Sequence, residues 1–176
     1  MALDAADLLQ IGHRADVRHA VGELYKDFQR EVAQRKPACS ASGNCCRFRA
    51  YGHRLYVTTI ELAVFAASLD ARAEWWSFDP KAPEQGICPL QFGNLCSVHT
   101  IRPFGCQVFF CDATAADWQR EQYEAFHARL KALHDRLDIP YRYMEWLSAL
   151  KALEIPARGL ERGDQRGALS LPQLRL

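Results

Sequence analysis

All seven cysteines of this chain lie between residues 39 and 111, and the long flanking segments contain none. Ala, Val and Leu fill a protein core without the risk of oxidation, so packing alone does not require such clustering. Thiols gathered in this way bind a metal, form disulfides or carry out redox chemistry. The seven are Cys39, Cys45, Cys46, Cys88, Cys96, Cys106 and Cys111.

The spacing of the cysteines differs from the compact metal-binding patterns. Two residues separate paired ligands in most zinc fingers and ribbons, but no C-x2-C pair occurs here. The run also differs from the bacterial ferredoxin pattern. A site built from these thiols must therefore be assembled from loops that are distant in the sequence.

A stable disulfide framework is the weaker interpretation of the cysteines. The first ten residues, MALDAADLLQ, lack the basic and apolar regions of a secretory signal. No run approaches the roughly 18 apolar residues of a membrane-spanning helix. We therefore expect a cytoplasmic protein without a membrane partner, whose thiols stay reduced. Seven is also an odd number, which prevents complete pairing within one chain.

The overall charge gives no sign of nucleic-acid binding. Twenty-two basic residues balance 21 acidic ones, for a net charge of +1, so no nucleic-acid partner is expected. The chain has 176 residues, of which 49% are hydrophobic, as is typical of one globular domain with its own core. We expect a single metal-binding domain over residues 1–155, with its cysteine cluster at 39–111, and a loosely ordered tail over 156–176.

Apolar periodicity predicts a mainly α fold with little β structure. Helices are expected over about 14–34, from 59 to about 69, from about 115 to 137, and over about 142–154, with a short strand at 55–57. Capping boxes are expected where Thr58 precedes Glu61 and where Thr114 precedes Asp117. The segment 86–111 contains several Gly and Pro residues and is expected to be mostly irregular. The predicted fold is thus a set of helices flanking irregular cysteine-rich loops gathered around a metal site.

The seven cysteines and His99 are the candidate metal ligands. His99 follows Cys96 by three residues, and His53 near the cysteine pair is a weaker candidate. Neighbouring side chains point to opposite sides in extended backbone, so Cys45 and Cys46 reach one small ion only if a turn joins them. Otherwise one of the pair packs in the core, or the two serve different metals.

Other roles remain open for single residues near the cysteines. One or two thiols can serve as small core side chains, and Cys111 is one candidate for that role. Four thiolates around a dication leave two net negative charges, which a guanidinium group would favour. Arg102 lies between two cysteines and is the better candidate for this role, ahead of the basic cluster of Arg47, Arg49 and Arg54.

The combined motif resembles the YkgJ-type cysteine-cluster family. The residues that carry the resemblance are Cys39, Cys45, Cys46, Cys88-Pro89-Leu90, Cys96, Arg102-Pro103 and Cys106. That family is described as a zinc- or iron-chelating domain, and its members are often labelled iron–sulfur oxidoreductases. The resemblance implies metal binding by these cysteines and leaves the metal and the reaction open. Cys111 matches only some members, and His99 stands where an aromatic residue is common.

Three functions are consistent with these residues. The first is a metal-binding protein that coordinates zinc or iron, including an iron–sulfur cluster, through its cysteines. The second is an iron–sulfur or non-haem iron oxidoreductase with a protein redox partner or an unidentified substrate. The third is a non-enzymatic interaction module whose zinc holds the loops together. The sequence contains no phosphate-binding loop or nucleotide fingerprint, so it does not decide whether the protein is an enzyme.

Overall fold

The computed structural model describes residues 4–72 and 76–155, and these are mainly helical, as predicted. Helices make up 62% and strands 7% of the described residues. The α-helices are α1 (Ala5–His13), α2 (Ala15–Arg35), α3 (Phe48–Tyr51), α4 (Thr59–Asp70), α5 (Phe104–Gln107), α6 (Ala116–Leu137) and α7 (Trp146–Ala152). The 3-10 helices are η1 (Asn44–Cys46), η2 (Ala82–Gln85), η3 (His99–Ile101) and η4 (Ala113–Ala115). The strands are β1 (Tyr56–Thr58), β2 (Gln91–Phe92), β3 (Leu95–Cys96) and β4 (Tyr143–Glu145).

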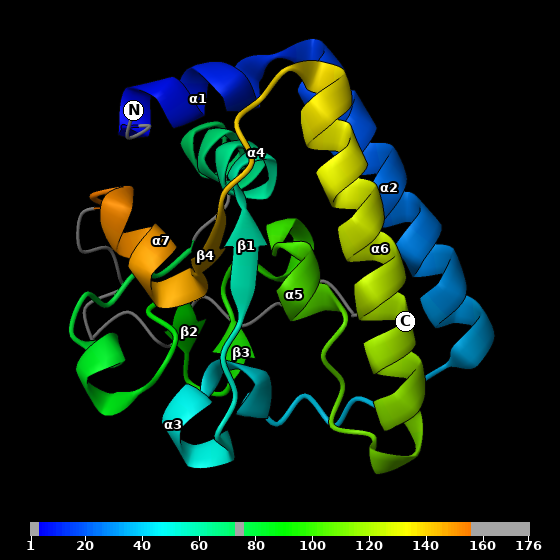
Figure 1. Ribbon diagram of the computed structural model, residues 1–176. Helices are drawn as coiled ribbons and strands as arrows, with labels where there is room; N and C mark the ends of the chain where they lie inside the picture. Colours follow the sequence, from blue (N-terminus) through cyan, green and yellow to red (C-terminus); the bar gives the residue numbers. More distant parts are fainter. Residues whose placement is uncertain (1–3, 73–75, 156–176) are drawn as a thin grey trace.

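The two long helices, α2 and α6, lie side by side along one edge of the molecule (Figure 1). Helix α1 packs on α4, and α4 also contacts α2. The antiparallel pair β1–β4 lies in the middle of the molecule, between α7 and α5 in the view of Figure 1. The second antiparallel pair, β2–β3, is a small hairpin within the cysteine-rich segment. The cysteine-rich segments therefore lie at the end of a helical frame.

Two clusters of buried side chains form the core. One joins α2, α5 and α6, where the ring of Phe104 meets Phe28 edge-on at 4.9 Å and stacks on Phe126 at 5.4 Å. The other joins α1, α4, β1 and α7, and contains Trp146, whose ring meets Phe65 at 5.0 Å. Five cysteines belong to this second cluster or pack against it. These five cysteines are thus part of the hydrophobic core or border it.

Most of the elements predicted from periodicity are confirmed. Helices α2, α4 and α6 agree within two residues with the expected ranges, and β1 is shifted by one residue from 55–57. The capping box is also present: Glu61 accepts hydrogen bonds from the Thr58 backbone N–H at 2.9 Å and from its hydroxyl at 2.8 Å. The segment 86–111 holds only short elements, as expected.

Two predictions of local structure were wrong, and a helix was missed. Residues 143–145 are not helical, because they form β4 and pair with β1, a contact that local periodicity does not reveal. Thr114 and Asp117 form no capping box, because the Thr114 hydroxyl donates to Asp112, which caps the preceding turn η4. Helix α1 was not expected; its own capping box joins Asp4 and Asp7.

The predicted tail over residues 156–176 lies outside the described residues. Within the part of the chain that the structure describes, no helix is both long and apolar enough to cross a membrane.

The carboxylate of Glu61 connects three elements. Besides capping α4, it accepts hydrogen bonds from the Tyr25 hydroxyl of α2 at 3.1 Å and from the Phe104 backbone N–H of α5 at 2.9 Å. Glu61 is only 3% exposed, and burial raises its pKa, although these donors act in the opposite direction. Four donors thus meet at two buried oxygens.

Replacement of Glu61 by Gln is expected to destabilise the fold. The backbone N–H groups of Thr58 and Phe104 bind different oxygens of Glu61. The Gln amide has only one acceptor oxygen, so its NH2 group faces the Thr58 N–H in one orientation and the Phe104 N–H in the other. An unsatisfied buried donor costs about 1–3 kcal/mol, and chemical denaturation should show a loss of this size. Glu145→Gln is the matched control, because Ser148 uses only one oxygen of Glu145. The prediction is wrong if both variants unfold at the same denaturant concentration.

Two glycines in helices should respond to alanine in opposite directions. A Cβ at Gly12 of α1 would lie 2.0 Å from the Ala63 carbonyl oxygen of α4, whereas a Cβ at Gly22 of α2 would meet nothing within 4 Å. Gly12→Ala should therefore cost about 1–3 kcal/mol or detach α1. Gly22→Ala should stabilise the protein by about 0.5–1 kcal/mol through its helix propensity. Thermal unfolding should show a lower melting temperature for Gly12→Ala and a higher one for Gly22→Ala. Equal changes in melting temperature would contradict the close packing of α1 on α4.

Candidate metal centre

Five of the seven thiols line one small cavity. Its volume is about 20 Å³. The cysteines in its wall are Cys45, Cys46, Cys88, Cys96 and Cys106. Three stretches that are far apart in the sequence contribute them: η1, the segment around the β2–β3 hairpin, and α5. The expectation that distant loops bring thiols together is met for these five.

A tight turn places the two adjacent cysteines in the same cavity wall. Cys45 and Cys46 lie in η1, which Gly43 precedes with a left-handed φ of 73°. A Cβ at Gly43 would lie 2.4 Å from the Asn94 carbonyl oxygen, so the loop needs glycine for its backbone and for its close approach to the hairpin. In a 3-10 helix neighbouring side chains are about 120° apart, so both can border one cavity. The turn that adjacent ligands would require is present.

Backbone hydrogen bonds hold the second cysteine segment against η1. The Cys88 N–H donates to the Cys46 carbonyl oxygen at 2.8 Å. The Gln91 N–H donates to the Cys88 carbonyl at 3.0 Å and turns the chain into β2. Cys96 then lies opposite Gln91 in the β2–β3 pair. These contacts carry Cys88 and Cys96 to the cavity in fixed register.

Cys106 reaches the cavity on the short helix α5. The Glu61 carboxylate holds the first N–H of this helix, that of Phe104. A Cβ at Gly105 would lie 2.9 Å from the Tyr56 carbonyl oxygen of β1, so α5 lies close against that strand. The fifth thiol is therefore positioned by the same buried carboxylate that caps α4.

The rest of the wall is apolar except for two groups. Arg102 lines the cavity, and its charge acts on the thiols of Cys45, Cys96 and Cys106. Trp146 also lines it, and its buried indole N–H has no hydrogen-bond partner within residues 4–72 and 76–155. A cation and a free donor thus border a group of sulfur atoms.

The thiols in the cavity differ in acidity. A hydrogen bond with Cys46 lowers the pKa of Cys45 to about 6. Cys96 also forms a hydrogen bond with Cys46, which lowers the pKa of Cys96. The pKa of Cys46 is raised by its hydrogen bonds with Cys45, Cys88 and Cys96. Burial, followed by the nearby thiolates, raises the pKa of Cys106. Cys46 and Cys106 therefore hold their protons more tightly than Cys45 and Cys96 do.

The other three candidate ligands lie apart from the cavity wall. Cys39 and Cys111 are exposed, and Cys111 Sγ lies 3.8 Å from the Ser42 hydroxyl. Because Cys111 is exposed, its suggested role as a core side chain is wrong. His99 is also exposed. Partial desolvation of the imidazole, followed by the nearby charge of Arg102, lowers the pKa of His99 to about 4.

His53 and the basic cluster serve local structure. The His53 ring stacks on Phe109 at 4.6 Å, and its Nε2 lies 3.2 Å from the Cys45 carbonyl oxygen. Arg47 donates to the Asn94 side chain at 2.6 Å, and Arg49 donates to the Glu84 carbonyl at 2.8 Å. Arg102 lines the thiol cavity, whereas Arg47, Arg49 and Arg54 are not among the residues of its wall. The sequence offered no signal for Trp146, which comes from α7, outside the cysteine-rich segment.

The described part of the chain contains no group of three or more His, Cys, Asp or Glu side chains placed to hold a metal ion. All seven cysteines are free. The five thiols share a cavity, but a bound metal requires deprotonated thiolates directed at one point. What the geometry provides is a cluster of thiols of unequal acidity beside a guanidinium group.

Comparison with known proteins adds no relative. No family model matches the chain. No curated protein and no solved structure matches it either. The functional argument therefore rests on the residues and their arrangement.

The pH dependence of alkylation tests the acidity of Cys45. In the reduced, metal-free protein, its reaction with iodoacetamide should rise with pH around a midpoint near 6, because the thiolate is the nucleophile. Cys46→Ala removes the hydrogen bond that lowers this pKa and should move the midpoint to higher pH. Cys111→Ala should leave it unchanged. Peptide mass spectrometry gives the rate at each pH, and an unshifted midpoint in Cys46→Ala would contradict the assignment.

Proposed function

We propose that this protein binds one metal ion, zinc or iron, through four of the five thiols that line the cavity. The observation that carries the proposal is the convergence of Cys45, Cys46, Cys88, Cys96 and Cys106 from three separate stretches on one small space. Thiolates are soft ligands that suit zinc and iron–sulfur chemistry. Four of them complete a closed zinc site.

The surroundings of the cavity fit a cluster of bound thiolates. Zinc held by four thiolates has an excess of two negative charges. Arg102 supplies a positive charge in the wall. The indole N–H of Trp146 is a buried donor that lacks a partner in the described residues, and a metal-bound sulfur is the kind of acceptor it needs. Hydrogen bonds to ligand sulfurs are a common means of tuning such sites.

The size of the cavity favours a single ion. Its volume of about 20 Å³ is close to that of one water-sized probe, roughly 10–15 Å³. A four-iron cluster would require the walls to separate. The size of the cavity therefore makes zinc the first choice, since thiolate ligands suit zinc and iron equally. Cys39, Cys111 and His99 remain candidates for a second, outer role.

A bound ion would hold the three cysteine segments together. Structural zinc contributes about 10–16 kcal/mol of apparent binding energy in small peptides, which exceeds the typical stability of a domain, about 5–15 kcal/mol. On this proposal the helical frame folds largely by itself, and the loops depend on the metal. The resemblance to the YkgJ-type family supports metal binding by the five cavity thiols, but it also includes Cys39, which is exposed and lies outside the cavity wall.

The main test is metal analysis of anaerobically purified protein. We expect about one zinc per chain, with metal–sulfur distances near 2.3 Å by X-ray absorption. One iron, or iron with labile sulfide and visible absorption, would favour the oxidoreductase alternative with a redox partner. Metal-free protein whose seven thiols all react freely would overturn the proposal.

Single serine substitutions should separate the ligands from the outlying thiols. Cys46→Ser, Cys88→Ser and Cys96→Ser are expected to lower the metal content sharply, because each removes a thiolate from the cavity. Cys39→Ser and Cys111→Ser, the matched controls, should retain it. Circular dichroism confirms that the helices are intact. Equal metal content in all five variants would contradict the assignment.

Chelation should loosen the cysteine segments more than the helical frame. After treatment with a chelator, limited proteolysis is expected to cut within residues 39–54 and 86–111, while α2 and α6 stay protected. Helical circular dichroism should change little. An unchanged cleavage pattern would show that the loops do not depend on metal.

A further inference from the structure

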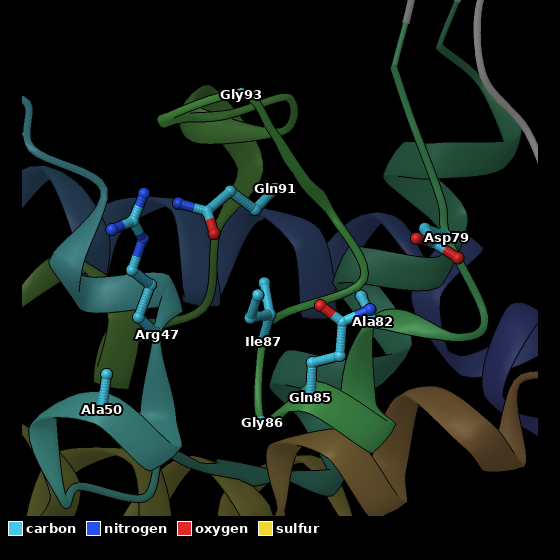
Figure 2. Close-up of a pocket in the computed structure, with 9 residues that line it drawn as sticks. All are labelled: Arg47, Ala50, Asp79, Ala82, Gln85, Gly86, Ile87, Gln91 and Gly93. Carbon is cyan, nitrogen blue, oxygen red and sulfur yellow. The ribbon is translucent and has the colours of Figure 1, made fainter.

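A second and larger cavity opens beside the thiol cavity. This cleft has a volume of about 360 Å³, within the range of about 300–1,000 Å³ typical of small-molecule sites. Figure 2 shows its walls: Arg47 lies at one end, Asp79 at the other, and Gln85, Gln91 and Ile87 lie between them. None of the residues that line it belongs to the thiol cavity.

Adjacent residues of the same chain segments line the two different cavities. Cys46 borders the thiols and Arg47 borders the cleft. Cys88 and Leu90 likewise border the thiols, whereas Ile87 and Gln91 border the cleft. The hydrogen bond from the Cys88 N–H to the Cys46 carbonyl joins the two segments at this point. The cleft is therefore built on an ordered part of the fold.

The two ends of the cleft carry opposite charges that form no ion pair in the described part of the chain. Arg47 donates to the neutral side chain of Asn94 at 2.6 Å. One oxygen of Asp79 accepts from the Lys81 backbone N–H at 2.9 Å. Within the described residues, neither side chain forms an ion pair. Each keeps further hydrogen-bonding capacity for a ligand, because a guanidinium has five N–H donors and a carboxylate has two acceptor oxygens.

The middle of the cleft combines amides with apolar surface. Gln91 donates its Nε2 to the Gly43 carbonyl at 3.0 Å, so its side-chain oxygen remains as an acceptor. Gln85 is exposed and adds a second amide. Ile87, Ala50 and Ala82 supply the apolar part. This lining suits a ligand whose centre has both peptide groups and small side chains.

We propose that this cleft binds a short peptide with free termini. Its carboxylate pairs with Arg47, its ammonium group pairs with Asp79, and its peptide groups meet the two glutamines. A polyphosphate does not fit, because Asp79 repels it, and a polyamine does not fit, because Arg47 repels it. The charges of a single amino acid are adjacent, whereas Arg47 and Asp79 lie at opposite ends (Figure 2).

Calorimetric titration with Ala-Ala and Ala-Ala-Ala tests the proposal, with versions of each peptide blocked at one end. Arg47→Gln should weaken binding of the free peptide at least tenfold and leave binding of the C-terminal amide unchanged. Asp79→Asn should likewise weaken binding of the free peptide at least tenfold, and it should leave binding of the N-acetyl peptide unchanged. Arg54→Gln is the matched control, since Arg54 lies outside the cleft, and it should bind normally.

Two outcomes would overturn the proposal: no binding of any of these peptides at millimolar concentration, or binding that neither variant at the ends of the cleft alters. The metal content of each variant is measured alongside, because Arg47 follows Cys46. Peptide binding by protein that proves to contain no metal would support the cleft and refute the metal site. Protein that contains the metal but binds none of the peptides would support the metal site and refute the peptide cleft.

Discussion

The buried carboxylate of Glu61 is the interaction on which the arrangement of this protein depends. It begins α4, holds the hydroxyl of Tyr25 on α2 and fixes the first N–H of α5 at Phe104. Burial opposes its charge, and the four donors compensate for the lost water. Because α5 carries Cys106, this one side chain links the helical frame to the thiol cavity.

The thiol cavity has the character of a core site rather than of a surface loop. Cys46 and Cys88 are buried, and the other three thiols pack against the same hydrophobic cluster. Apolar walls strengthen each charge within them, which explains why neighbouring thiols differ so much in acidity. A metal bound there would be shielded from water and from competing ligands. The exposed Cys39 and Cys111 have no such protection.

Local signals in the sequence predicted the helical frame well and the cavity only in part. The capping box of Thr58 and Glu61 spans three residues and could be found directly, as could the periodic faces of α2 and α6. The strand at 143–145 could not, because its partner at 56–58 is remote in sequence. For the same reason, spacing alone could not separate Cys39 and Cys111 from the other thiols, nor find Trp146 in the wall.

The alternation of residues between the two cavities has a mechanical consequence. The backbone between Cys46 and Arg47, and between Ile87 and Cys88, separates the two cavities, so each of these segments borders both. If metal binding drew the sulfur atoms together, it would shift the floor of the cleft, and a ligand in the cleft would in turn restrain the sulfur atoms. Thermodynamic linkage requires the two effects to be equal in free energy. A partition of this kind would convert occupancy on one face into affinity on the other.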